Sequence, residues 1–201
     1  EYFAVKANPN PFLINIMNEY GCGCDCSSLT ELMLAKSLGF DGPAIMFSSN
    51  DTPREEFAYA NEIGAIINLD DITHIQYLEE TIGTLPETMS IRYNPGGVFE
   101  MSNGIMDNPG DSKYGFTKAQ LFEGFGLLKD KGVKNFGIHA FRASNTVTNE
   151  YYADLAKQLF KLAVELKDKL NVSLQFINLS GGVGVAYRPD QEENSIIEIG
   201  K

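Results

Sequence analysis

Apolar residues along this chain follow two alternating patterns. Short runs that are rich in apolar residues indicate strands, and they are separated by stretches in which apolar residues recur at helical spacing. The first run ends at Lys6 and is bulky, so we expect a buried strand with a lysine at its carboxyl end. Seven strands are predicted in all: Tyr2–Lys6, Cys22–Cys26, Ala44–Ser49, Ala65–Leu69, Met89–Asn94, Phe136–Phe141 and Leu174–Leu179.

Helical periodicity fills the segments between these strands. The clearest case is 150–170, where Leu155, Leu159, Leu162, Ala163 and Leu166 fall on one helical face. Six helices are expected: Phe12–Tyr20, Leu29–Leu38, Arg54–Ile63, Ile72–Thr81, Lys118–Lys131 and Glu150–Leu170. Strands that alternate with helices in this way predict parallel βαβ connections and an α/β fold.

Two α/β architectures fit that alternation, an open doubly wound sheet and a (β/α)8 TIM barrel. A dinucleotide-binding doubly wound sheet needs a glycine-rich turn after its first strand, but the first turn is Ala7-Asn8-Pro9. Glycines occur instead after the seventh strand, in Ser180–Gly184, where barrels often bind phosphate. We therefore expect residues 1–201 to form one partial barrel domain. Seven strands do not close an eight-stranded barrel, so either the chain is a fragment that lacks the eighth strand or something else covers the open edge.

Composition narrows the choice of partners. A net charge of −11 argues against binding to nucleic acid or to an anionic membrane surface, and no apolar stretch approaches the length of a membrane span. Cys22, Cys24 and Cys26 lie at a spacing of two, which is poor geometry for chelating one metal ion. We interpret them as small core residues of a protein from the reducing cytoplasm.

In a barrel, the carboxyl ends of the strands meet at one mouth, where the chemistry is carried out. Polar residues are common at strand ends, and this explains Asn68, Asp70 and Asn94. It does not explain a lysine after a buried strand or a glycine loop of the kind that binds phosphate. The long segment Gly96–Tyr114 follows the fifth strand, and we expect a functional lid there in preference to a disordered loop.

Five short motifs carry a family resemblance. They occur in the order Phe3-Ala4-Val5-Lys6-Ala7-Asn8, Asp25-Cys26-Ser27-Ser28-Leu29-Thr30-Glu31-Leu32, Arg92-Tyr93-Asn94-Pro95-Gly96, Lys113-Tyr114-Gly115 and Asn178-Leu179-Ser180-Gly181-Gly182. In these motifs the chain resembles the pyridoxal-phosphate-dependent decarboxylases built on the alanine-racemase-type barrel, and most closely the diaminopimelate decarboxylases. The resemblance covers nearly the whole chain.

The resemblance implies roles for residues at the mouth. Lys6 would be the catalytic residue that holds pyridoxal phosphate as an internal Schiff base. Gly181 and Gly182 would offer backbone N–H groups to the phosphate, because a chain without Cβ atoms can approach an anion closely. Asp25 and Arg92 match residues that line the cofactor near its reactive end.

The run after the sixth strand departs from the family pattern. The family has His-x-His-x-Gly-Ser, whereas this chain has His139-Ala140-Phe141-Arg142-Ala143-Ser144. Ser144 matches a phosphate-binding serine and His139 the first histidine, while Phe141 stands where a histidine stacks on the cofactor. A phenyl ring can stack on pyridine, but it cannot donate a hydrogen bond. In the glycine loop, Ser180 replaces the first of three glycines.

The implied activity is decarboxylation of an amino acid, most closely of meso-diaminopimelate to L-lysine in lysine biosynthesis. Related barrels that decarboxylate ornithine, arginine or carboxynorspermidine are alternatives, and so is a non-catalytic barrel that only binds pyridoxal phosphate. We expect a small-molecule amino-acid substrate and a homodimer in the full-length protein. In the family, the glutamate partner for the pyridine nitrogen lies on the eighth strand, and a C-terminal β-domain completes the site. Both are missing from residues 1–201, so these residues alone are expected to be inactive.

Overall fold

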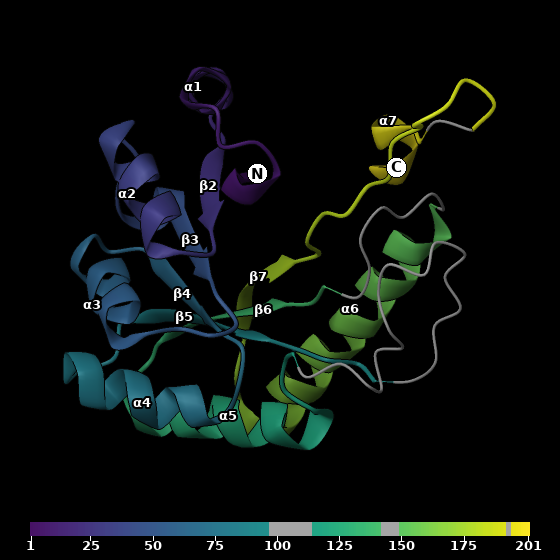
Figure 1. The fold of residues 1–201 in the computed structure, drawn as a ribbon. Coiled ribbons are helices and arrows are strands. Elements are labelled where there is room, and N and C mark those ends of the chain that lie inside the picture. Colours follow the sequence, from purple (N-terminus) through teal and green to yellow (C-terminus); the bar gives the residue numbers. More distant parts are fainter. Residues whose placement is uncertain (97–113, 142–148, 192–193) are drawn as a thin grey trace.

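One parallel sheet contains the strands of this protein in the order in which they occur along the sequence (Figure 1). The computed structural model describes residues 1–96, 114–141, 149–191 and 194–201. The strands within these ranges are β1 (Tyr2–Ala4), β2 (Gly23–Cys26), β3 (Ile45–Ser48), β4 (Ile66–Leu69), β5 (Thr88–Arg92), β6 (Asn135–His139) and β7 (Leu174–Asn178). The seven predicted strands are thus confirmed, each within two residues at either end.

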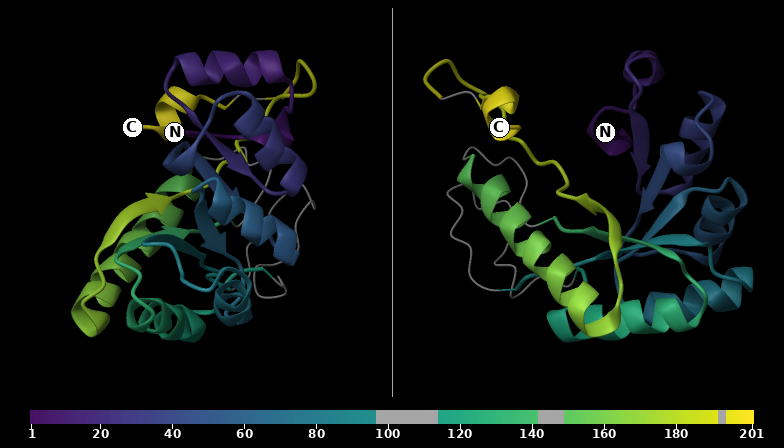
Figure 2. Two further views of the ribbon diagram at one scale, coloured as in Figure 1. Left: turned by 90° about the vertical axis from the view of Figure 1, so that its left-hand side faces the viewer. Right: turned by 180° about the vertical axis from the view of Figure 1, so that it is seen from behind.

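The sequential strand order decides between the two architectures. A doubly wound sheet reverses its strand order at a switch point, whereas each strand here pairs only with its neighbours in sequence. The sheet curls into an incomplete barrel, and helices cover its outer face (Figure 2). These helices are α1 (Pro11–Glu19), α2 (Leu29–Ser37), α3 (Arg54–Glu62), α4 (Thr73–Ile82), α5 (Lys118–Asp130) and α6 (Glu150–Leu170). The short helix α7 (Ile196–Ile199) lies beside the C-terminus, away from the sheet (Figure 1).

The first strand is shorter and less buried than predicted. It ends at Ala4, its side chains are only half-buried, and Val5–Ala7 form a 3₁₀ turn that leaves Lys6 exposed. Two local causes account for this. β1 is an edge strand that pairs only with β2, and Asn10 begins α1 by accepting a hydrogen bond from the Phe12 N–H at 3.0 Å. The prediction of a buried strand before Lys6 is therefore wrong, although Lys6 does follow the carboxyl end of β1.

The core lies between the sheet and its covering helices. Cys24 and Cys26 on β2 are fully buried, as expected for small core residues, whereas Cys22 precedes the strand and is half-buried; all three are free thiols. At the other end of the sheet, Gly137 leaves room for the Phe176 ring, which a Cβ atom at that position would meet at 2.1 Å. The buried face of α6 is formed by Tyr151, Tyr152, Leu155, Leu159, Leu162 and Leu166.

Two further expectations concern membrane spans and the lid. Among the described residues, no helix combines the length and apolar character needed to cross a membrane. The expected lid falls largely on 97–113, which lies outside the described residues. Just after these residues, the Gly115 N–H donates to the Asp70 carbonyl at 3.1 Å. The next residue, Phe116, pairs with Tyr93, which directly follows β5.

Candidate functional site

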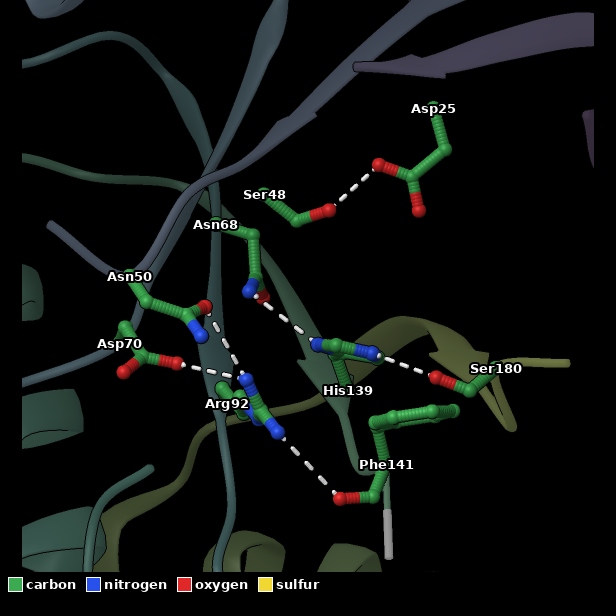
Figure 3. A network of polar contacts seen from close by, with 9 residues as sticks. All are labelled: Asp25, Ser48, Asn50, Asn68, Asp70, Arg92, His139, Phe141 and Ser180. Atoms are coloured by element: carbon green, nitrogen blue, oxygen red, sulfur yellow. Dashed lines mark hydrogen bonds and ion pairs between the residues drawn. The ribbon is translucent and has the colours of Figure 1, made fainter. Parts of the chain in front are cut away.

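Arg92 is the centre of a buried polar cluster at the carboxyl ends of β4 and β5 (Figure 3). Its Nη1 donates to Asp70 Oδ1 and to Asn50 Oδ1, both at 3.1 Å, and its Nη2 donates to the Phe141 carbonyl at 3.4 Å. Arg92 is 7% exposed and Asp70 is 4% exposed. The guanidinium carbon also lies 5.8 Å from the centre of the Phe141 ring and 5.4 Å from that of Tyr114. The side chain is therefore fixed in position by several contacts.

A second set of contacts runs through His139 at the end of β6. Its Nδ1 lies 3.2 Å from the amide nitrogen of Asn68 on β4, and its Nε2 lies 2.7 Å from the hydroxyl of Ser180 after β7 (Figure 3). Burial lowers the pKa of His139 to about 3, and the positive charges of Arg92 and Lys6 add to this effect. The imidazole is therefore neutral at physiological pH.

Lys6 and Asp25 lie on the β1–β2 side of the same mouth. Asp25 lies within β2, and its Oδ1 accepts a hydrogen bond from the Ser48 hydroxyl at the end of β3. Burial raises the pKa of Asp25 to about 6, while the Ser48 hydrogen bond and the charge of Lys6 act in the opposite direction. Because the charge of Lys6 acts on both Asp25 and His139, its amine belongs to the same mouth as both groups.

The glycine loop after β7 has an unusual backbone. Ser180 and Gly182 adopt positive φ angles of 63° and 83°, and the Ser180 N–H donates to Asn178 Oδ1 at 2.8 Å. A Cβ atom added at Gly181 would meet no atom of the described chain within 4 Å. The fold therefore requires glycine at 182 for its backbone conformation, whereas the protein's own packing leaves open space at 181.

The family is decided by a match along the whole chain. The model for the pyridoxal binding domain of the pyridoxal-dependent decarboxylases matches residues 1–201. The chain belongs to this family. Pyridoxal phosphate is accordingly the cofactor of the family, as the motifs imply, and the barrel is the fold that the resemblance predicts.

Individual relatives agree with the family match. The chain is 35% identical over 192 residues to the protein TabA of Pseudomonas amygdali pv. tabaci, covering 96% of this chain and 44% of TabA. It is 29% identical over 199 residues to diaminopimelate decarboxylase of Thermoplasma acidophilum, covering 98% and 48% of the two chains. The chain spans about half the length of the curated relatives it matches.

Solved structures support the fold. Diaminopimelate decarboxylase from Helicobacter pylori, crystallised with L-lysine, superposes with a TM-score of 0.88 at 22% identity, covering 98% of this chain and 51% of that one. The enzyme from Methanocaldococcus jannaschii gives a TM-score of 0.87 at 23% identity, covering 98% and 47%. At this level of identity the likeness establishes the barrel architecture.

The mouth has features that suit a phosphorylated aldehyde. The exposed Lys6 amine can reach a ligand, and the space at Gly181 is open to one. Among the described residues, Arg92 Nε and Asn68 Oδ1 are buried polar atoms without a hydrogen-bond partner. No cluster of three potential metal ligands occurs in the part of the chain that the structure describes. The residues present therefore fit the family's cofactor.

Of the residues predicted from the sequence, all but Ser144 lie in the described ranges; Ser144 lies outside them. The structure brings Arg92 into direct contact with Phe141, and Arg92 is the register partner of His139 where β5 pairs with β6. Lys6 and Asp25 lie on the other side of the mouth, and Gly181 and Gly182 follow β7.

The interpretation of Asn68 and Asp70 as ordinary strand-end residues is wrong. Asn68 is 3% exposed and contacts His139, while Asp70 is 4% exposed and pairs with Arg92. A signal was present in the run Ile66-Ile67-Asn68-Leu69-Asp70, because an asparagine inside an otherwise apolar buried strand needs a partner. Two further groups complete the two sets of contacts and are not predicted from the sequence, the Asn50 side chain and the Ser180 hydroxyl.

Proposed function

We propose that the natural-length protein carrying this chain is a pyridoxal-phosphate-dependent amino-acid decarboxylase, with meso-diaminopimelate as its substrate. The observation that carries this proposal is one barrel mouth shared by an exposed lysine, an open glycine loop and a rigid, buried arginine cluster. The similarity to diaminopimelate decarboxylases from several organisms supports the choice of substrate.

Lys6 is the residue that would hold the cofactor covalently. It is exposed in a short turn, so its amine can reach a bound aldehyde without disturbing packed side chains. Pyridoxal phosphate supplies an electron sink for the electron pair left behind when CO2 departs. The charge of Lys6 acts on Asp25, so the two groups lie close together. Burial raises the pKa of Asp25 to about 6, so its carboxyl group can exchange a proton in the physiological pH range.

The remaining residues would orient the bound cofactor. The N–H groups of Gly181 and Gly182, together with Ser144, would hold the phosphate. The Phe141 ring would cover one face of the cofactor, and Arg92 would keep that segment in place through the Phe141 carbonyl. His139 is neutral, so it would contribute a fixed hydrogen-bonding group without adding charge.

Chemical trapping tests the role of Lys6. The natural-length protein is incubated with pyridoxal phosphate, reduced with borohydride and digested for peptide mapping. We expect the reduced adduct on Lys6, and the variant Lys6→Ala should lose it while Lys36→Ala keeps it. An adduct on another lysine would remove Lys6 from the site.

A substrate panel then tests the reaction. CO2 release and the amine product are measured with meso-diaminopimelate, ornithine, arginine and carboxynorspermidine. Diaminopimelate is expected to give the highest kcat/KM, with L-lysine as the product. If only another amino acid is turned over, the protein is still a decarboxylase but its substrate is not diaminopimelate. Cofactor binding without CO2 release from any of the four amino acids would favour a non-catalytic carrier.

For the same protein we propose a homodimer in the cytoplasm. The three free thiols, two of them fully buried, are consistent with a reducing compartment. Light scattering at several protein concentrations measures the assembly, and a monomer throughout would contradict the dimer.

A further inference from the structure

Ser180 holds a backbone conformation that serine rarely adopts. Its φ of 63° lies in the left-handed region, and Asn171 is the only other non-glycine residue with a positive φ among those the structure describes. Asn171 terminates α6, a position where asparagine in this conformation is common. No helix end explains the left-handed conformation of Ser180, which lies in a loop of glycines. Strain of this kind persists where surrounding contacts impose it, and it is concentrated at functional sites.

The contacts of Ser180 fix its side chain on the inner side of the loop. Its hydroxyl lies 2.7 Å from His139 Nε2, and its backbone N–H is held by Asn178 Oδ1 at 2.8 Å. On the other side of the imidazole, His139 Nδ1 faces the amide nitrogen of Asn68 at 3.2 Å. Figure 3 shows Asn68, His139 and Ser180 in a line across the mouth.

The direction of the hydrogen bonds follows from the number of protons. An amide nitrogen can only donate, so His139 Nδ1 accepts from Asn68 and carries no proton. A neutral imidazole has one N–H, which must then be at Nε2 and must donate to the Ser180 oxygen. The hydroxyl hydrogen of Ser180 is thereby turned away from His139 and is available to another acceptor.

We propose that Ser180 is a further cofactor-binding residue, whose hydroxyl donates a hydrogen bond to the phosphate of pyridoxal phosphate. His139 and Asn68 are the positioning residues that orient this hydroxyl. The inference rests on the proposed function, since it assigns the phosphate to the loop that contains Gly181 and Gly182. It explains why a strained serine stands beside glycines, because the left-handed conformation directs the hydroxyl toward the mouth.

Two substitutions separate the hydroxyl from the backbone strain. Ser180→Gly removes both, whereas Ser180→Ala removes the hydroxyl and keeps the strain. Both variants of the natural-length protein should lose affinity for pyridoxal phosphate by roughly ten- to a hundredfold, the effect of one hydrogen bond to a charged acceptor. Affinity for pyridoxal, which lacks the phosphate, should stay the same. Ser180→Gly should nevertheless raise the melting temperature of the cofactor-free protein.

Asn171→Gly is the matched control, since it changes the other left-handed position, at the opposite end of the barrel. It should leave both affinities unchanged. The nitrogen NMR signals of His139 provide an independent readout, with Nε2 expected to carry the proton. Its signals must be distinguished from those of His74, the other histidine within residues 1–201, and from those of any histidine elsewhere in the natural-length protein.

The outcomes separate the two proposals. Failure of the unmodified protein to bind either pyridoxal phosphate or pyridoxal would overturn the proposed function. A second result would be that the two Ser180 variants bind pyridoxal phosphate over pyridoxal with the same ratio of affinities as the unmodified protein does. That result would overturn the role of Ser180 and leave the proposed function intact. A proton on Nδ1 of His139 would overturn the orientation of the hydroxyl.

Discussion

The two sides of the barrel mouth are built in opposite ways. On the β1–β2 side, Lys6 is exposed in a short turn and can reach a ligand, while burial raises the pKa of Asp25 to about 6, so that this carboxyl group can exchange a proton near neutral pH. On the β4–β6 side, Arg92 and His139 are buried and held by several partners each. In the proposed decarboxylase, one side would perform the chemistry while the other fixes the geometry around it.

Removing Lys6 is expected to give the largest functional effect with the smallest structural one. Lys6→Ala should abolish nearly all turnover, because no other group would hold the cofactor covalently. The melting temperature of the cofactor-free protein should be unchanged, since the side chain is exposed. Parallel activity assays and thermal melts measure both quantities. A large loss of stability would show that this side of the mouth is also structural.

Asp70→Asn should produce the reverse result on the opposite side. It would leave the buried Arg92 charge without its ionic partner, at a cost of about 3–5 kcal/mol in the free energy of unfolding. The matched control is Asp41→Asn, which breaks the exposed pair with Lys36 and should cause little measurable change. Urea denaturation of both variants gives the comparison, and equal losses would contradict the rigid role of the Arg92 cluster.

Asp25 should make stability depend on pH in a predictable direction. Burial raises its pKa from 3.8 to about 6, so the folded chain binds this proton more tightly than the unfolded chain does. The stability contributed by this group is complete below pH 3.8 and is lost as pH rises through 6.

Asp25→Asn should therefore stabilise the cofactor-free protein at pH 7 by about 3 kcal/mol, with little effect at pH 4. Denaturation curves across this range measure the difference between the two proteins. An equal effect at both pH values would mean that the carboxyl group is not perturbed by burial.

The two adjacent glycines after β7 should give the smallest and most selective effects. Gly181→Ala should leave the free energy of unfolding unchanged, because the new Cβ meets no atom of the described chain within 4 Å. It should lower the affinity for pyridoxal phosphate by about tenfold, since the methyl group would occupy space next to the phosphate.

Gly182→Ala is the paired variant, and it should cost about 1–2 kcal/mol even without cofactor, because φ is 83° at that position. Isothermal titration and thermal melts on both proteins separate the two effects. Unchanged cofactor affinity in Gly181→Ala would argue that the phosphate binds elsewhere.

Much of the fold could be predicted because it depends on local patterns. The strands and helices follow from the spacing of apolar residues, and the barrel follows from their alternation together with the position of the glycines. The burial of β1 could not be predicted in this way, because an edge strand and a central strand have similar sequences. Burial depends on how many neighbours a strand has, and the apolar pattern does not report that number.

A site can be proposed from the sequence where a residue type carries its own chemistry, as Lys6 and the glycine loop do. Asn68 and Asp70 were misinterpreted because their roles depend on partners that are distant in sequence. Asn68 meets His139 across 71 positions, and this contact exists only because the parallel register brings the ends of β4 and β6 to one mouth. A polar residue at a strand end has the same sequence signature whether it faces solvent or a buried partner.

The sequential strand order also bears on how the protein is made. Paired residues in neighbouring strands lie a few tens of positions apart, from Phe3 with Cys24 to Arg92 with His139. During synthesis, each new strand can therefore dock beside the one that emerged from the ribosome just before it, without waiting for a distant segment. The Arg92 cluster would thus begin to assemble only after the β1–β3 units are in place, so the rigid half of the mouth would form on a scaffold that already carries Lys6.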